Sequence, residues 1–220
     1  MNEIEGVIKF KLDYTNTPLP EQIVNDCRDT LSTLNVWRNI LKQLGMIGQD
    51  PLRYNGLGFG NMSIRTETNH AAFLITGTQT GKLNDLQQHH FSLVTAANTE
   101  NNSIVASGKI RPSSEALTHA SIYSADQSIQ VIIHIHFPLI WQLTRQLNFS
   151  ATASNVAYGT PQMALAVINL VKSIQTDQPA VFAMLGHEDG VVAYGDTVEG
   201  VAQTLIGLLA RALKYKNASV

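Results

Sequence analysis

The chain has 220 residues, 44% of them hydrophobic, and a formal net charge of −2, and its length fits one sizeable domain or two small ones. Its 15 lysine and arginine residues are dispersed along the sequence, which argues against a nucleic-acid-binding protein with a basic face. The single cysteine excludes an intrachain disulfide, the acidic N-terminus lacks the pattern of a signal peptide, and no apolar stretch approaches the ~20 residues of a membrane-spanning helix, so a cytoplasmic protein is expected.

The first part of the chain predicts a short strand, a long helical segment and a glycine-rich loop. Residues 7–12 largely alternate apolar and polar side chains, which is typical of a half-buried strand. Apolar residues recur at helical spacing over residues 23–44, and Gly45 is a suitable C-terminal cap. This segment is long enough for two helices. Residues 56–63 read as a glycine-rich loop that leads into a strand.

The middle of the chain predicts mainly strands. Residues 71–76 form an apolar run that ends at a turn. Residues 91–97 and 103–107 predict a hairpin, because a polar turn segment separates them. A helix is expected to begin at Ser114 and to run to about Ala125.

The rest of the chain alternates strands and helices. We expect strands at 130–136, 180–185 and 191–194, and helices beginning at Pro138, over 161–174 with Thr160 as the N-cap, and over 198–215. Interleaved helices and strands with hairpins among them predict a layered α/β domain whose sheet is mixed or antiparallel.

His134-Ile135-His136, at the end of an apolar run, is the strongest indication of a functional site. Side chains alternate along a strand, so His134 and His136 project to the same face. The alternative, two core histidines bonded to backbone groups, fits less well, because burying two adjacent imidazoles without a shared partner costs solvation. His187, in a turn after another apolar run, is a third candidate ligand, and three protein ligands leave a position open for substrate or water. Imidazoles bind several divalent metals, among which availability and a histidine-rich site favour zinc.

Glu115 is a candidate acid or base beside this site. It lies in the first turn of its predicted helix, where a carboxylate also stabilises the helix dipole, so a capping role is the alternative. Ser113 and Ser114 could bind a phosphate or carboxylate at the same helix start, with Ser114 as a simple N-cap the alternative. The loops at Asn61 and at residues 76–78 are small, polar and glycine-bearing, and such loops offer backbone N–H groups to an anion.

Three further polar residues lie near these motifs. His119 is one turn beyond Glu115 and is interpreted as a structural residue or one that supports the site. Glu188 and Asp189 flank His187 and either orient a histidine or are solvated turn residues.

Together these segments resemble the class II aldolase/adducin family over roughly residues 34–212. The motifs, in chain order, are Gly60-Asn61-Met62-Ser63, Ala72-Phe73-Leu74-Ile75-Thr76 with Gly77-Thr78, Pro112-Ser113-Ser114-Glu115, His134-Ile135-His136, Tyr158-Gly159-Thr160 and Gly186-His187. The resemblance implies a three-layer α/β/α fold with a mostly antiparallel central sheet. It also implies a single domain over residues 1–220, in which residues 1–20 are an added strand segment without a counterpart in the family.

The resemblance further implies a set of site residues and partners. Zinc, or another divalent metal, would be bound by His134, His136 and His187, and Glu115 would be the catalytic carboxylate. Substrate phosphate would be held by Asn61, Thr76, Gly77, Ser113 and Ser114. Family members are usually cyclic homotetramers with active sites between subunits, so a homotetramer is expected. The expected partner is a small sugar phosphate or sugar acid, and neither a nucleic acid nor a membrane.

The function so implied is a metal-dependent lyase of aldolase type, which cleaves or forms a C–C bond through an enediolate stabilised by the metal. A dehydratase or decarboxylase with the same site and a non-catalytic, adducin-like scaffold are the alternatives. Two departures from the family favour a divergent subgroup. The segment 76–83 differs from the Thr-Pro-Ser-Gly form of the second phosphate loop, and no tyrosine lies between Phe137 and Val156 to serve as the family's proton donor.

Overall fold

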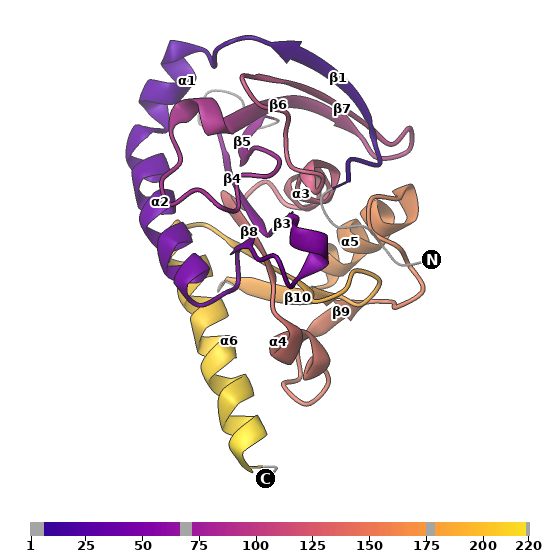
Figure 1. The fold of residues 1–220 in the computed structure, drawn as a ribbon. Helices are drawn as coiled ribbons and strands as arrows, with labels where there is room; N and C mark the ends of the chain where they lie inside the picture. The colour runs from indigo at the N-terminus through magenta and orange to yellow at the C-terminus, as the bar shows by residue number, and fades with distance from the viewer. Residues whose placement is uncertain (1–6, 67–71, 175–178, 219–220) are drawn as a thin grey trace.

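The fold is built on a nine-stranded sheet, seen in the computed structural model, which describes residues 7–66, 72–174 and 179–218 (Figure 1). The strands follow one another across the sheet in the order β1-β7-β6-β5-β4-β8-β11-β10-β9. In chain order they are β1 (Lys11–Asn16), β4 (Asn61–Arg65), β5 (Phe73–Thr76), β6 (Phe91–Asn98), β7 (Ser103–Gly108), β8 (Val131–His136), β9 (Ser150–Thr152), β10 (Ala180–Met184) and β11 (Gly190–Gly195). A separate pair joins β2 (Gly48–Gln49) and β3 (Gly58–Phe59).

The sheet is mostly antiparallel, as expected. Only the outermost pairs are parallel, because β1 joins β7 and β9 joins β10 in that orientation. The central strand β8 lies between β4 and β11 and is antiparallel to both. A strand with neighbours on both sides has every backbone group paired, which makes β8 a rigid base for a site.

Helices cover both faces of the sheet and complete the three layers (Figure 1). One face carries α1 (Glu21–Asp26), α2 (Arg28–Gln43), α4 (Pro138–Gln142) and α6 (Val198–Ala218). The other face carries α3 (Ala116–Ala125) and α5 (Pro161–Ser173), which pack against each other. Among the described residues, no helix combines the length and the apolar character needed to cross a bilayer.

Alternation along β8 divides its side chains between two cores. Ile133 and Ile135 pack into the core beneath α2 and α6, whereas Ile132 packs into the core beneath α3 and α5. His134 and His136 follow Ile132 at intervals of two residues and share its face. The histidines therefore point toward the α3 and α5 layer.

Most elements expected from the sequence are present. The hairpin is confirmed as β6 and β7, and α5 begins after Thr160, whose hydroxyl accepts a hydrogen bond from the Met163 amide. The long helical segment is two helices. α2 ends at Gln43 with Leu44 as its C-cap, and Gly45 follows with a positive φ, next to the hydrogen bond from the Met46 amide to the Leu41 carbonyl.

Two details of the strands differ from expectation. The strand expected at 7–12 is displaced, because β1 takes its register from β7, with Lys11 opposite Ser103 and Asn16 opposite Gly108. The strands β2, β3 and β9 are two or three residues long, too short to give a periodic signal. Ala71, expected at the start of a strand, lies outside the described residues.

Candidate metal centre

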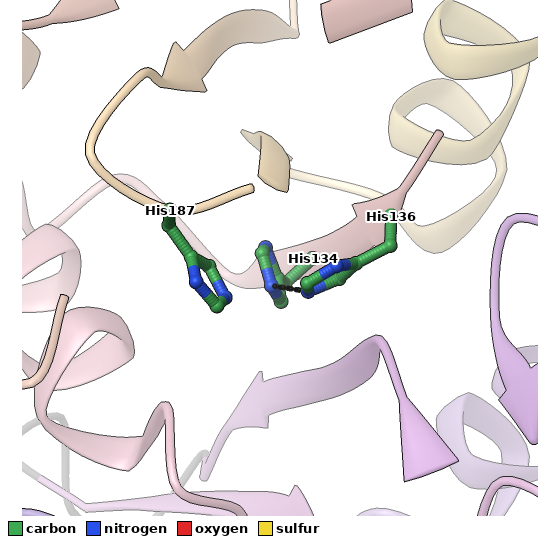
Figure 2. Close-up of side chains that lie close together, drawn as sticks. All are labelled: His134, His136 and His187. Carbon is green, nitrogen blue, oxygen red and sulfur yellow. Dashed lines mark hydrogen bonds between the residues drawn. The ribbon is translucent and has the colours of Figure 1, made fainter. Parts of the chain in front are cut away.

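Strand β8 and the turn after β10 bring three histidines together (Figure 2). His134 and His136 come from the same face of β8, and both are fully buried. His187 lies in the turn between β10 and β11, where its amide bonds to the Met184 carbonyl and its carbonyl accepts from the Gly190 amide. The antiparallel pairing of β11 with β8 places Gly190 opposite His136, which brings this turn next to the end of β8.

The three side chains converge on one point. The Nε2 atoms of His134 and His136 are 3.0 Å apart, and one potential ligand nitrogen from each of the three residues lies within 4.8 Å of the others. Zinc–nitrogen bonds of about 2.1 Å in a tetrahedral site place ligand nitrogens roughly 3.4 Å apart. The three nitrogens lie close enough together that these residues could hold one metal ion after small side-chain rotations.

Burial keeps two of these histidines neutral. The pKa of His134 and the pKa of His136 are held well below the ordinary value of 6.5, first because burial disfavours the charged ring and second because His187 lies close by. A neutral imidazole has one nitrogen lone pair available for a metal. His134 and His136 can therefore bind a cation at neutral pH without first losing protons.

Glu115 lies directly beside the cluster. Its Oε1 atom is 3.6 Å from His187 Nε2, and the residue is 1% exposed. The hydroxyl of Thr118, one turn further along α3, donates a 2.9 Å hydrogen bond to Oε2 and fixes the carboxyl group. The geometry places a carboxyl group where it can exchange a proton with a molecule bound at the histidines.

The start of α3 differs from both simple capping alternatives. Glu115, rather than Ser114, occupies the N-cap position, and its side chain makes no capping hydrogen bond. Instead the Ser113 hydroxyl accepts from the Glu115 amide at 3.3 Å. The N-cap assignment of Ser114 is therefore wrong, because the helix begins one residue later than that assignment requires.

The residues expected to bind phosphate lie on adjoining elements. Asn61 is opposite His134 in the pairing of β4 with β8, and its buried Oδ1 atom has no hydrogen-bond partner among the described residues. The Thr76 hydroxyl accepts from the Met62 amide, and the Thr76 carbonyl accepts from the Ser113 amide, so β4, β5 and the start of α3 meet here. Ser114 is buried at the same helix start.

Gly77 is also close to this group, but its amide is already used. The Gly77 amide donates to the His90 carbonyl at 2.8 Å, and the Thr78 amide donates to the Arg111 carbonyl at 3.0 Å. A ligand at this loop would therefore bind to side chains rather than to these two backbone N–H groups.

His119 has the structural surroundings expected for it. It is fully buried, and its Nδ1 atom is 2.7 Å from the Ser63 hydroxyl, which also lies 2.9 Å from the Tyr123 hydroxyl. Burial lowers the pKa of His119 to about 3. This histidine is therefore neutral in the folded protein at physiological pH.

Arg53, Tyr54 and Asp189 form a hydrogen-bonded cluster beside His136, and sequence reasoning missed the first two of them. The ring of Tyr54 meets the His136 ring edge-on at a centroid distance of 4.9 Å, and the Tyr54 hydroxyl donates to Asp189 at 2.7 Å. The Arg53 guanidinium donates to the Tyr54 hydroxyl and to the His136 carbonyl. Asp189 is one of the two turn residues named above as possible supports, whereas no local pattern in the sequence marks Arg53 or Tyr54.

Tyr158 is the second residue whose place the sequence does not reveal. Its motif carries part of the family resemblance, but no role for its side chain follows from the sequence. Tyr158 is fully buried and its ring stacks on that of His187, with 4.2 Å between centroids and 30° between planes. The third histidine of the cluster is thus covered by an aromatic ring.

Comparisons with known proteins identify a family and a shared fold. The family model described as "Class II Aldolase and Adducin N-terminal domain" matches residues 51–213. A comparison with curated proteins gives no match.

Several solved structures have a similar fold. L-fuculose-1-phosphate aldolase from Thermus thermophilus superposes with a TM-score of 0.61 at 17% identity, over 86% of this chain and 94% of the other. A sugar-phosphate aldolase from Thermotoga maritima gives a TM-score of 0.63 at 15% identity, over 88% and 97%. An aldolase II superfamily protein from Pseudomonas syringae gives 0.61 at 13% identity, over 92% and 80%. At these identities the likeness concerns the fold.

Proposed function

The chain belongs to the class II aldolase and adducin family, and from this premise we propose that it is a divalent-metal-dependent lyase of aldolase type. The reaction is the reversible cleavage of a C–C bond in a small phosphorylated or carboxylated sugar derivative. The observation that carries the proposal is the convergence of three buried histidines with a buried carboxyl group 3.6 Å from one of them. A scaffold domain without turnover has no need of this arrangement.

His134, His136 and His187 are the proposed metal ligands. A bound divalent ion supplies a Lewis acid that polarises a substrate carbonyl. We propose zinc because three neutral imidazoles suit it, and other divalent ions share this preference. β11 pairs with β8 as far as His136 and β4 pairs with it as far as His134, so hydrogen bonds to neighbouring strands hold the backbone that carries both histidines.

Glu115 is the proposed proton carrier. The carboxyl group takes up or returns, at Oε1, the proton that the substrate exchanges at the carbon beside its carbonyl. The Thr118 hydroxyl holds Oε2, so the carboxyl group keeps one orientation during the exchange. A fixed, buried acid–base group close to the reacting atoms lowers the entropic cost of the transfer.

The anionic end of the substrate is proposed to bind at Asn61, Thr76, Gly77, Ser113 and Ser114. The two serine side chains and the Asn61 amide are the main donors in this proposal, since the Gly77 amide bonds to the His90 carbonyl. Fixing the anion at a distance from the reacting carbons orients the bond that breaks.

We further propose that residues 1–220 form one domain and that the domain assembles as a homotetramer in the cytoplasm. The nine-stranded sheet supports the first point, because it contains both β1 from the start of the chain and β11 from its last part. Light scattering of the purified protein measures the assembly.

The test combines metal analysis with a substrate panel. Protein purified without a histidine tag or chelator should contain divalent metal, and a panel of ketose and aldonate phosphates should include one that it cleaves to an aldehyde. Glu115→Gln should retain the metal and lose activity by about 100-fold or more. Glu199→Gln, at an exposed position on α6, is the matched control and should retain full activity.

The products separate the competing functions. Loss of water or of carbon dioxide without C–C cleavage into an aldehyde would replace the aldolase proposal by a dehydratase or decarboxylase. Protein that binds no metal, with Glu115→Gln indistinguishable from wild type, would favour the scaffold.

A further inference from the structure

The segment before β1 reaches the aromatic ring that covers His187. Lys9 places its Nζ atom 3.5 Å from the centroid of the Tyr158 ring. His187 stacks on the same ring at 4.2 Å. Two groups at these distances would collide on one face of the ring, so Lys9 and His187 lie on opposite faces. The order through space is therefore Lys9, Tyr158, His187.

Hydrogen bonds join Tyr158 to the segment before β1. The Lys9 ammonium donates to the Tyr158 carbonyl at 3.4 Å, and the Tyr158 hydroxyl donates to the Val7 carbonyl at 3.3 Å. The Asn102 side-chain amide donates to the carbonyls of Lys9 and Gly159 and so ties both segments to the β6–β7 turn. An ammonium over an aromatic face adds electrostatic attraction to these contacts.

Close packing transmits this support to the histidine turn. A Cβ atom on Gly159 would lie 2.9 Å from Lys9 Cδ, so the stem of Lys9 rests directly on the backbone there. A Cβ atom on Gly186 would lie 1.8 Å from the Val156 carbonyl oxygen. Residues 156–159 are thus held between Lys9 on one side and the Gly186–His187 turn on the other, without space for a methyl group at either contact.

We propose that Lys9 is a positioning residue of the metal centre, which acts through Tyr158 to fix the ring of His187. The inference rests on the proposed three-histidine metal site and adds to it a segment that precedes the family match at residues 51–213. A histidine ligand binds its metal most tightly when neighbouring groups hold its ring in the binding orientation. His134 and His136 receive this support from a central strand, whereas His187 lies in a turn and depends on Tyr158 and Lys9.

The test is metal binding by full-length variants. Lys9→Met keeps the aliphatic stem over Gly159 and removes the charge. It should weaken Zn²⁺ and Co²⁺ binding about tenfold in competition with a chromophoric chelator, and it should change the visible absorption spectrum of bound Co²⁺. Lys9→Arg should restore both readouts, because a guanidinium also stacks on an aromatic ring. Lys11→Met removes the same charge from an exposed position in β1 and should bind both ions as wild type does.

A second variant tests the route through Tyr158. Tyr158→Leu should weaken metal binding at least as much as Lys9→Met, and adding Lys9→Met to it should cause no further loss, since the two act as one unit. Circular dichroism and thermal unfolding of the metal-free proteins identify any variant that does not fold.

The outcomes distinguish this inference from the proposed function. A Lys9→Met protein with wild-type affinity and a wild-type Co²⁺ spectrum would overturn the positioning role and leave the metal centre intact. Additive losses in the double variant would overturn the route through Tyr158. A wild-type protein that binds neither ion would overturn the metal centre and the positioning role together.

Discussion

The hydroxyl of Tyr54 donates a 2.7 Å hydrogen bond to the carboxylate of Asp189. It thereby joins the loop before β3 to the turn that carries His187, two segments far apart in the sequence. The Tyr54 ring also contacts the His136 ring. Tyr54 therefore contacts one of the three histidines directly and, through Asp189, the turn that carries His187. The proposed metal centre is therefore held by Tyr54 with Asp189 on one side and by Tyr158 with Lys9 on the other.

Tyr54→Phe should remove the hydrogen bond to Asp189 while keeping the aromatic contact with His136. Loss of a hydrogen bond to a buried carboxylate costs about 2 kcal/mol in the free energy of unfolding, and we expect metal affinity to fall about tenfold. Tyr14→Phe is the control, because it removes a hydrogen bond to the Gly108 carbonyl at the far edge of the sheet. Urea unfolding and chelator competition measure the two effects. Wild-type metal affinity in Tyr54→Phe would show that the hydrogen bond between Tyr54 and Asp189 stabilises the fold without affecting metal binding.

His134→Ala should abolish most metal binding. The variant removes one ligand at a strand end, and the strand keeps its backbone pairing with β4 and β11, so the fold should persist. Zinc at 100 times its dissociation constant stabilises a folded protein by about 2.7 kcal/mol, and His134→Ala should lose that stabilisation in thermal unfolding. The exposed His89→Ala should behave as wild type. Equal metal content in His134→Ala and wild type would contradict the ligand assignment.

The metal-free protein should lose stability in acid, in part through His119. Burial lowers the pKa of this residue to about 3, whereas in the unfolded chain it is about 6.5. The stability contributed by neutral His119 is therefore complete above pH 6.5 and is lost as the pH falls toward 3. Between pH 7 and pH 5 the loss is about 2 kcal/mol.

His119→Gln isolates this contribution, since glutamine can also bond to Ser63 but does not titrate. Its free energy of unfolding in urea should fall by about 2 kcal/mol less than that of wild type over this interval. If both proteins lose the same amount, His119 takes up its proton without unfolding and the assigned pKa is wrong.

Two glycine substitutions should affect different properties, one the metal affinity and the other the free energy of unfolding. Gly186→Ala would place a methyl group 1.8 Å from the Val156 carbonyl oxygen, so the His187 turn must move and metal affinity should fall at least tenfold. Gly207→Ala meets nothing within 4 Å on α6 and should raise the free energy of unfolding by about 1 kcal/mol, because alanine favours a helix. A Gly186→Ala protein with wild-type affinity would mean that the turn adapts without moving His187.

The parts of the fold that the sequence predicted are those with strong local patterns. The apolar run before His134 and the proline after Thr160 each act within a few residues, and β8 and α5 are found where these signals place them. The face shared by His134 and His136 also follows from local geometry, because alternation along a strand needs no information about its neighbours.

The remaining features depend on contacts between distant residues. The strand expected at 7–12 is found at Lys11–Asn16 because β7 sets its register. Tyr54 and Asp189 are 135 positions apart, and Lys9 and Tyr158 are 149 positions apart. No periodicity links residues at such separations. The contacts of Tyr54 and Tyr158 with the histidine cluster could therefore not be predicted from the sequence, although the three histidines themselves could.

The position of β1 also bears on how the protein can be shortened. β1 covers the outer side of β7 over Ser103–Gly108, and an uncovered strand offers its amides and carbonyls to any other chain that can pair with it. A fragment trimmed to the family-matched residues 51–213 would lose this pairing and would also lose α2, whose Leu34 and Leu41 are buried in the core. We expect such a fragment to aggregate during purification, because it would expose apolar core residues as well as the edge of β7.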